Sequence, residues 1–183
     1  MDDIKILGDT ADYMYRFQCQ SRGPPETRFG YWRVLLKFLV LAMKENGFSH
    51  DGDVYQFGVF EGVSMGWLRH IFPQHRLIGF DSFSGLPEEA DNVATFNSWK
   101  PGAFSSGDIR DILQHKLGGP SAFVKGFFNE SLTDSLPREL RLRPAVYIDI
   151  DADLYVSAYQ ALDFMFGHGL VKPGTFIGYD DWW

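Results

Sequence analysis

The chain has 183 residues and a formal net charge of −7, and 45% of its residues are hydrophobic and 16% aromatic. This length and this amount of apolar surface are typical of one globular domain and exclude an intrinsically disordered chain. The acidic balance argues against binding to a nucleic-acid backbone. The single cysteine, Cys19, cannot form an intramolecular disulfide, and the longest apolar run, residues 34–43, is too short to span a bilayer. We therefore expect a soluble, cytoplasmic protein.

The first part of the chain is expected to be helical. Residues 9–20 form a weak amphipathic pattern, and residues 21–25, which contain glycine and two prolines, interrupt it. Residues 31–46 are strongly apolar and favour a helix that ends at Gly47. We assign residues 1–50 to an N-terminal helical segment and residues 51–183 to an α/β domain.

Beyond residue 50, short apolar runs alternate with helix-like stretches. Strands are predicted at residues 53–58, 76–80, 122–125, 145–150 and 175–179, and helices at residues 63–71, 106–117 and 154–166. Strands and helices that alternate at this spacing form βαβ units, which place parallel strands in one sheet with helices on both faces. The sequence therefore predicts a doubly wound α/β fold, in which ligands bind beyond the carboxyl ends of the strands.

Two glycines follow the first predicted strand, and an acid ends the second. Gly58 and Gly62 permit a tight turn and the close approach of a ligand to the next helix, although a turn that needs positive φ angles explains them equally well. Asp81 follows Gly58 at about the spacing of 20 residues at which a strand-end carboxylate accepts the hydroxyls of a ribose. A helix cap or a solvated loop acid is the alternative for Asp81. Together these residues predict an adenosine-containing cofactor, either NAD or S-adenosylmethionine.

Acidic residues follow the fourth and fifth predicted strands. Asp149, Asp151 and Asp153 share one side if the strand continues that far, and Asp180 and Asp181 end the fifth strand. Carboxylates that lie close together repel each other unless a cation or a proton intervenes. A ligand set made only of oxygen atoms suits Mg²⁺, Ca²⁺ or Mn²⁺. The alternative for each of these residues is a solvated loop acid.

Five segments in the same order resemble the class I S-adenosylmethionine-dependent methyltransferases, and among them the macrocin O-methyltransferase type. That family acts on sugar hydroxyls of natural products. The resemblance covers roughly residues 55–181, and the matching segments are FGVFEGVS at 57–64, FDSFSGLP at 80–87, residues 126–137, DADLYVS at 151–157 and residues 172–181. The chain is therefore expected to have a Rossmann-like methyltransferase fold.

The resemblance implies a role for each of the candidate site residues. Asp153 matches the position of the general base, which takes the proton of the acceptor hydroxyl. A divalent metal such as Mg²⁺, which lowers the pKa of that hydroxyl, is implied at Asp151, Asp180 and Asp181. Cofactor contacts are implied for Gly58, Gly62, Asp81, Ser64, Ser82, Asp149 and also Gln56, which stands where the family usually has an acid.

The resemblance also bears on partners and on the extent of the fold. It implies a small hydroxylated acceptor, and it implies that residues 1–50 cover the cofactor or form a homodimer contact. Residues 91–107 are long and aromatic, as an acceptor lid would be. A complete fold of this class continues with a helix and an antiparallel strand pair, so we expect either a sheet that lacks this pair or a fragment of a longer enzyme.

Two other functions stay open. An S-adenosylmethionine-binding module without turnover fits Gln56 and the early end of the chain, whereas the retained acids at residues 151, 153, 180 and 181 favour an enzyme. A nicotinamide-dependent oxidoreductase could use the same sheet. The sequence lacks the Gly-x-Gly-x-x-Gly loop and the Tyr-x-x-x-Lys pair that such an enzyme would need. The identity of the acceptor is not encoded in a recognisable pattern.

Overall fold

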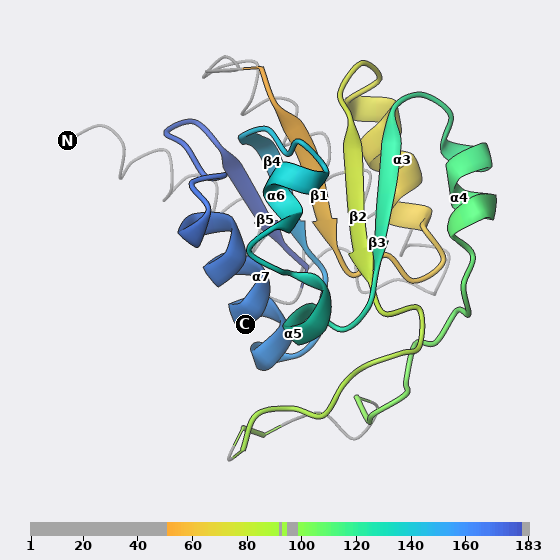
Figure 1. The fold of residues 1–183 in the computed structure, drawn as a ribbon. Helices are drawn as coiled ribbons and strands as arrows, with labels where there is room; N and C mark the ends of the chain where they lie inside the picture. The colour runs from red at the N-terminus through yellow and green to blue at the C-terminus, as the bar shows by residue number, and fades with distance from the viewer. Residues whose placement is uncertain (1–50, 92, 95–98, 181–183) are drawn as a thin grey trace, which may run out of the picture. The chain divides into compact units, whose positions relative to one another are not determined.

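A five-stranded parallel sheet forms the centre of the fold. The computed structural model describes residues 51–91, 93–94 and 99–180, so the helices predicted at 9–20 and 31–46 lie outside the described residues. The strands are ordered β3-β2-β1-β4-β5 across the sheet (Figure 1). Their bounds are β1 Asp53–Phe57, β2 Leu77–Asp81, β3 Ser121–Lys125, β4 Ala145–Ile150 and β5 Phe176–Tyr179. The predicted doubly wound α/β fold is confirmed, and the strand order reverses between β1 and β4.

Helices cover both faces of the sheet. The bounds are α3 Val63–Ile71, α4 Arg110–Leu117, α5 Phe128–Ser131, α6 Leu136–Glu139 and α7 Tyr155–Gly167. Right-handed crossovers that run in opposite directions from the reversal point place α3 and α4 on one face and α5, α6 and α7 on the other (Figure 1). None of the described helices is long and apolar enough to cross a membrane.

The helix predicted at residues 106–117 begins only at Arg110, which corrects the prediction at its amino end. Gly107 has a left-handed φ of +70°, which a helix cannot include. The helices α5 and α6, of four residues each, were not predicted, because so short a helix carries no periodic pattern.

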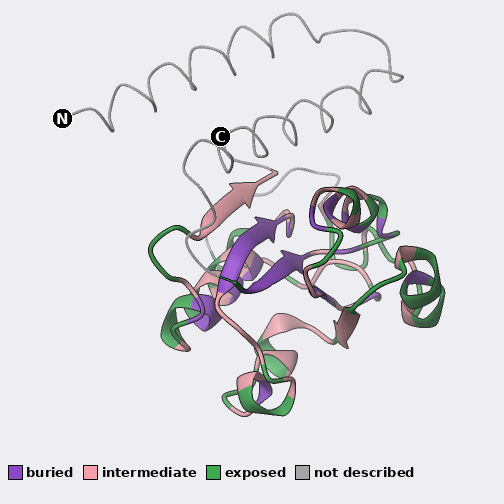
Figure 2. Ribbon diagram, turned by 90° about the horizontal axis from the view of Figure 1, so that it is seen from above, coloured by how far each residue is buried: buried purple, intermediate pink, exposed green. Residues whose placement is uncertain are grey.

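The central strands form the core because both of their faces are covered. Every residue of β1 and β4 is buried, whereas β5 at one edge is half-buried along its length, as the colours in Figure 2 show. On one face Phe57 and Phe80 stack with their ring centroids 4.6 Å apart, and Phe164 of α7 packs into the same cluster. On the other face Phe72, at the end of α3, stacks on Tyr147. Two polar side chains in these strands, Gln56 and Asp149, point to that second face.

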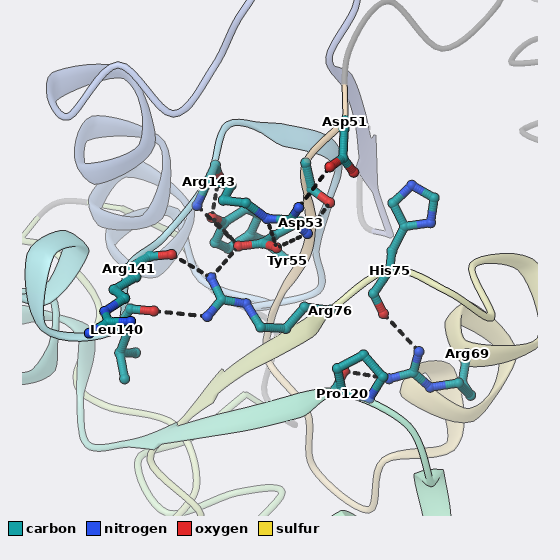
Figure 3. Close-up of polar contacts among 11 residues, drawn as sticks. Asp51, Asp53, Tyr55, Arg69, His75, Arg76, Pro120, Leu140, Arg141 and Arg143 are labelled. Atoms are coloured by element: carbon teal, nitrogen blue, oxygen red, sulfur yellow. Dashed lines mark hydrogen bonds and ion pairs between the residues drawn. The ribbon is translucent and has the colours of Figure 1, made fainter.

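An ion-pair network around one buried carboxylate lies at the amino ends of β1, β2 and β4 (Figure 3). Asp53 is fully buried and pairs with Arg76, which precedes β2, and with Arg143, which precedes β4. The Arg143 Nε atom donates to Asp53 at 2.9 Å, and its backbone N–H donates to the same carboxylate at 3.0 Å. Tyr55 donates its hydroxyl to the Arg143 carbonyl, and burial raises the pKa of that hydroxyl. The network ties three strands together at the edge opposite the candidate site.

Candidate functional site

The candidate site residues gather at the carboxyl edge of the sheet. Gly58 directly follows β1, Asp81 ends β2, Asp151 follows β4 and Asp180 follows β5. Backbone pairing continues past the strand ends, because the Asp151 N–H donates to the Phe57 carbonyl at 2.9 Å and the Asp180 N–H donates to the Ile150 carbonyl at 3.1 Å. The strand reversal between β1 and β4 falls at this edge, which is where open α/β sheets bind their ligands. Asp181 lies outside the described residues.

Both glycines of the loop after β1 are required by the protein's own structure. Gly58 has a φ of +90°, and a Cβ atom there would lie 1.7 Å from the Asp151 carbonyl oxygen. Gly62 has a φ of +76°, and a Cβ atom there would lie 2.3 Å from a methyl carbon of Leu113. The loop after β1 therefore packs directly against the turn after β4. The turn geometry alone accounts for both glycines, and their contact with a cofactor stays a prediction.

Asp81 holds the loop after β1 and the loop after β2 through hydrogen bonds to their backbone N–H groups. Its Oδ2 accepts the N–H groups of Val59 at 2.6 Å and Phe60 at 2.8 Å, and its Oδ1 accepts the N–H of Phe83 at 2.6 Å. A carboxylate has about four acceptor positions, so three bonds leave Oδ1 with room for one further donor such as a ribose hydroxyl. The carboxylate of Asp81 thus shapes the glycine loop whether or not a ribose binds.

Ser82 shapes the turn that follows Asp81. Its hydroxyl donates to the Gly85 carbonyl at 2.7 Å and accepts the Ser84 N–H at 3.0 Å. This is the local bonding by which serine stabilises a tight turn. The structure shows this turn role for Ser82, and its predicted cofactor contact stays a prediction.

Gln56 and Asp149, which are buried, and Ser64, which is half-buried, form a polar group between β1, β4 and α3. Gln56 and Asp149 are partners in the strand register, and the Gln56 amide donates to the Ser64 hydroxyl and, at 2.8 Å, to the Gly58 carbonyl. Tyr147 donates its hydroxyl to Asp149 Oδ1 at 2.8 Å. The Gln56 carbonyl oxygen and Asp149 Oδ2 are both buried, and neither has a hydrogen-bond partner among the described residues.

The Asp149 carboxyl is held near the midpoint of its titration at neutral pH. Burial, together with a smaller effect of the Asp180 charge, raises its pKa to about 7, although the hydrogen bond from the Tyr147 hydroxyl acts in the opposite direction. A neutral carboxyl is the less costly form for a group that is 3% exposed. Gln56 and Asp149 are thus packed inside the sheet, and the cofactor contacts expected of them stay predictions.

The acids after β4 and β5 lie close enough to act on the same groups. The charges of Asp151 and Asp180 both raise the pKa of the buried Tyr147, after the larger effects of burial and of Asp149. Among residues 51–91, 93–94 and 99–180, no group of three acidic, histidine or cysteine side chains is arranged to hold a metal ion. The described residues therefore supply two of the three predicted metal ligands and do not form a complete site on their own.

Asp153 lies on a tight turn between β4 and α7 and not on an extension of the strand. β4 ends at Ile150, so the side shared by residues 149, 151 and 153 in an extended strand does not form. Asp153 has a left-handed backbone with a φ of +58°, and the Leu154 N–H donates to the Ala152 carbonyl. Non-glycine residues in this conformation are uncommon, and they concentrate at functional sites.

Two features of the site were not predicted from the sequence. Glu89 accepts hydrogen bonds from the first backbone N–H groups of α7, across 66 residues of chain. The exposed rings of Phe60 and Phe104 meet edge to face, with their centroids 6.0 Å apart, so the loop after β1 contacts residues near the end of the predicted acceptor lid. The sequence points to Glu89 only indirectly. Leu154, which precedes α7, cannot cap the helix with its side chain, so the free N–H groups of the first turn need an acceptor from elsewhere.

Comparisons with solved structures agree with the fold. A crystal structure of CalS11, described as a calicheamicin methyltransferase, matches with a TM-score of 0.64 and 20% identity, over 94% of this chain and 77% of that chain. An apo structure of CalS11, described as a TDP-rhamnose 3'-O-methyltransferase, matches with a TM-score of 0.52 and 18% identity, over 95% of this chain and 77% of that chain. At these identities the two structures show a shared fold. A search of curated proteins found no match.

A family model gives the more specific result. The model described as macrocin O-methyltransferase (TylF) matches residues 36–183, which is well over half of the chain. The matched range includes the glycine loop, Asp81 and the acids that follow β4 and β5. The chain therefore belongs to the macrocin O-methyltransferase (TylF) family of O-methyltransferases.

Proposed function

We propose that the protein is an S-adenosylmethionine-dependent O-methyltransferase that methylates a sugar hydroxyl of a natural product or of its nucleotide-linked precursor. The observation that carries the proposal is the family match over residues 36–183. The description of CalS11 as a TDP-rhamnose 3'-O-methyltransferase supports a sugar acceptor. The carboxyl edge of the sheet, where the strand order reverses, is the place for both substrates.

The cofactor is proposed to bind beyond β1 and β2. The remaining acceptor position on Asp81 Oδ1 suits a ribose hydroxyl, and the exposed Phe60 lies beside it on the loop that Asp81 orders. Gly58 and Gly62 keep that loop in the conformation that Asp81 holds. Gln56 and Ser64 act behind the loop, through their hydrogen bonds to each other and to the Gly58 carbonyl.

The reaction needs a positioned base and an in-line approach. The acceptor oxygen forms a bond to the sulfonium methyl carbon, the carbon–sulfur bond breaks, and its electron pair stays on the sulfur of S-adenosylhomocysteine. The hydroxyl proton passes to the Asp153 carboxylate, which lies on the turn directly before α7. Alignment of oxygen, carbon and sulfur accounts for much of the remaining rate enhancement.

We also propose that a divalent cation binds at the ends of β4 and β5. Asp151 and Asp180 are at adjacent strand ends, and their joint effect on the pKa of Tyr147 supports a site of concentrated negative charge. Asp181 follows Asp180 in the sequence and would be the third ligand. When bound there, a Mg²⁺ ion would lower the pKa of the acceptor hydroxyl.

The remaining partner assignments follow from composition and resemblance. The net charge of −7 supports a small-molecule acceptor over a nucleic acid, and the single cysteine supports a cytoplasmic location. The homodimer implied by the resemblance is tested by light scattering on the purified chain.

The test is methyl transfer from labelled S-adenosylmethionine to TDP-rhamnose and to macrocin. We expect a methylated product from one of these acceptors, and we expect Asp153→Asn to lower kcat by about 100-fold or more while binding S-adenosylhomocysteine as the wild type does. Cofactor binding without transfer to either acceptor would favour the alternative of a binding module. Unchanged turnover in Asp153→Asn would contradict the role of the base.

A further inference from the structure

The helix α7 begins without a cap from its own sequence. Its N-cap residue, Leu154, makes no side-chain hydrogen bond to the helix, and its first turn contains no acid. Glu89 supplies the missing acceptors, because its Oε2 accepts the Tyr155 N–H at 2.7 Å and its Oε1 accepts the Val156 N–H at 2.9 Å. A carboxylate that bridges two free N–H groups at the positive end of a helix dipole makes a charge-assisted contact.

Glu89 belongs to the long connection between β2 and α4, which leaves the carboxyl edge of the sheet (Figure 1). Two backbone hydrogen bonds draw the ends of this connection together: the Leu86 N–H donates to the Ala103 carbonyl at 2.8 Å, and the Gly102 N–H donates to the Leu86 carbonyl at 2.9 Å. Glu89 lies just beyond this closure, on the same connection as the predicted acceptor lid. Its carboxylate therefore attaches the lid side of the connection to α7.

The point of attachment is next to the candidate base. Asp153, whose left-handed φ is +58°, directly precedes the cap of α7. On the β4 side, the turn is held by the bond from the Asp151 N–H to the Phe57 carbonyl. On the α7 side, it is held by the two bonds to Glu89. A left-handed aspartate keeps its conformation only where its surroundings over-determine it, and these contacts do so from both directions.

We propose that Glu89 is a positioning residue for methyl transfer. It fixes the first turn of α7 against the connection that follows Asp81, and so keeps Asp153 in register with the cofactor side of the site. This inference rests on the proposed function for its catalytic consequence. The contact itself does not depend on that function.

The contact is tested by amide hydrogen exchange in the full chain. In Glu89→Ala we expect the protection of the Tyr155 and Val156 amides to fall about tenfold or more relative to the wild type. Glu89→Gln should keep part of the protection, because its amide carbonyl can accept one of the two bonds. The matched control is Glu88→Ala, which removes the exposed neighbouring acid and should leave both amides protected as in the wild type. If the Tyr155 and Val156 amides of Glu89→Ala are as protected as in the wild type, the contact is overturned.

The catalytic part is tested by steady-state kinetics with the acceptor, TDP-rhamnose or macrocin, that the wild type methylates. We expect Glu89→Ala to lower kcat about tenfold or more, Glu89→Gln to lower it less, and the dissociation constant for S-adenosylhomocysteine to stay as in the wild type. A loss of folding alone would weaken cofactor binding as well. An unchanged kcat in Glu89→Ala, or an equal loss in Glu88→Ala, overturns the proposal. Failure of the proposed function looks different, because the wild type itself would then transfer no methyl group to either acceptor, whether or not it binds the cofactor product.

Discussion

Asp149 places an ionisable group in the middle of the sheet. Burial raises the pKa of its carboxyl from 3.8 to about 7. Between these two pH values the folded protein holds a proton that the unfolded chain has released. The free energy of unfolding therefore falls as the pH rises from about 4 to 7 and levels off above that range.

Asp149→Asn should remove this dependence. The substitution keeps the shape of the side chain. The amide of the new asparagine can donate to the Gln56 oxygen that has no partner among the described residues, on the neighbouring strand β1. We expect the variant to be more stable than the wild type by about 4 kcal/mol at pH 8 and by less than half of that at pH 5. Urea unfolding in EDTA at both pH values measures the difference. A variant that is less stable than the wild type at pH 8 would contradict an Asp149 carboxyl whose pKa is raised by burial.

At the scale of single residues, the sequence predicted positions better than roles. Gly58 and Asp81 could be found because each stands at the end of an apolar run, where parallel strands end at the same edge. Their local tasks, a close backbone approach and three bonds to backbone N–H groups, depend on loops that meet only in the folded chain. Glu89 could not be found, because its partners lie 66 and 67 residues away and are backbone atoms that carry no sequence signal.

At the scale of elements, the turn after β1 depends on a glycine for two separate reasons. Gly58 combines a φ of +90° with a backbone oxygen 1.7 Å from the position of a Cβ atom. Gly102 has a similar φ of +81°, and among the described residues no atom beyond its two chain neighbours lies within 4 Å of the position of its Cβ atom. Comparison of the two positions separates steric overlap from backbone strain.

We expect Gly102→Ala to destabilise the protein by about 1 kcal/mol, which is the strain of a left-handed alanine. Gly58→Ala adds overlap with a backbone atom that cannot move aside, so we expect a loss of about 3 kcal/mol or more. Thermal or urea unfolding of both variants measures the two effects. Equal losses at the two positions would show that the loop after β1 does not pack against Asp151 as described.

Elements with a strong pattern could be predicted, and those without one could not. The strand β4 was predicted with its observed bounds, because residues 145–150 form a short, mainly apolar run that is buried on both faces of the sheet. The start of α4 was misplaced, because the left-handed Gly107 interrupts a stretch with helix-forming composition. Asp153 would have shared a side with Asp149 and Asp151 only if the strand had continued past Ile150, and its left-handed turn is not marked by a residue pattern.

At the scale of the whole molecule, the two edges of the sheet have different tasks. The carboxyl edge carries the candidate site, and the amino edge carries the network around Asp53 (Figure 3). The side chain of Asp53 is fully buried, whereas those of Arg76 and Arg143 are 26% and 43% exposed. The network joins β1 to the segments before β2 and β4, far along the chain from each other.

Asp53→Asn should destabilise the fold by about 2–4 kcal/mol, because it leaves two arginines near a buried group that no longer carries a charge. Asp51→Asn is the matched control, since Asp51 pairs with the same Arg143 but is 81% exposed. Asp51→Asn should lower the free energy of unfolding by less than about 0.5 kcal/mol. Urea unfolding of both variants measures the contrast. Similar losses of stability in both variants would show that the contribution of Asp53 does not depend on its burial.

The central claim is that this fold binds S-adenosylmethionine at the carboxyl edge of the sheet. The most direct measurement is calorimetric titration of the purified chain with S-adenosylhomocysteine, which requires no knowledge of the acceptor. We predict binding of one molecule per chain with a dissociation constant in the micromolar range, and a weaker interaction in Asp81→Ala. No heat of binding at protein concentrations well above that range, from a chain shown to be folded, would contradict the claim.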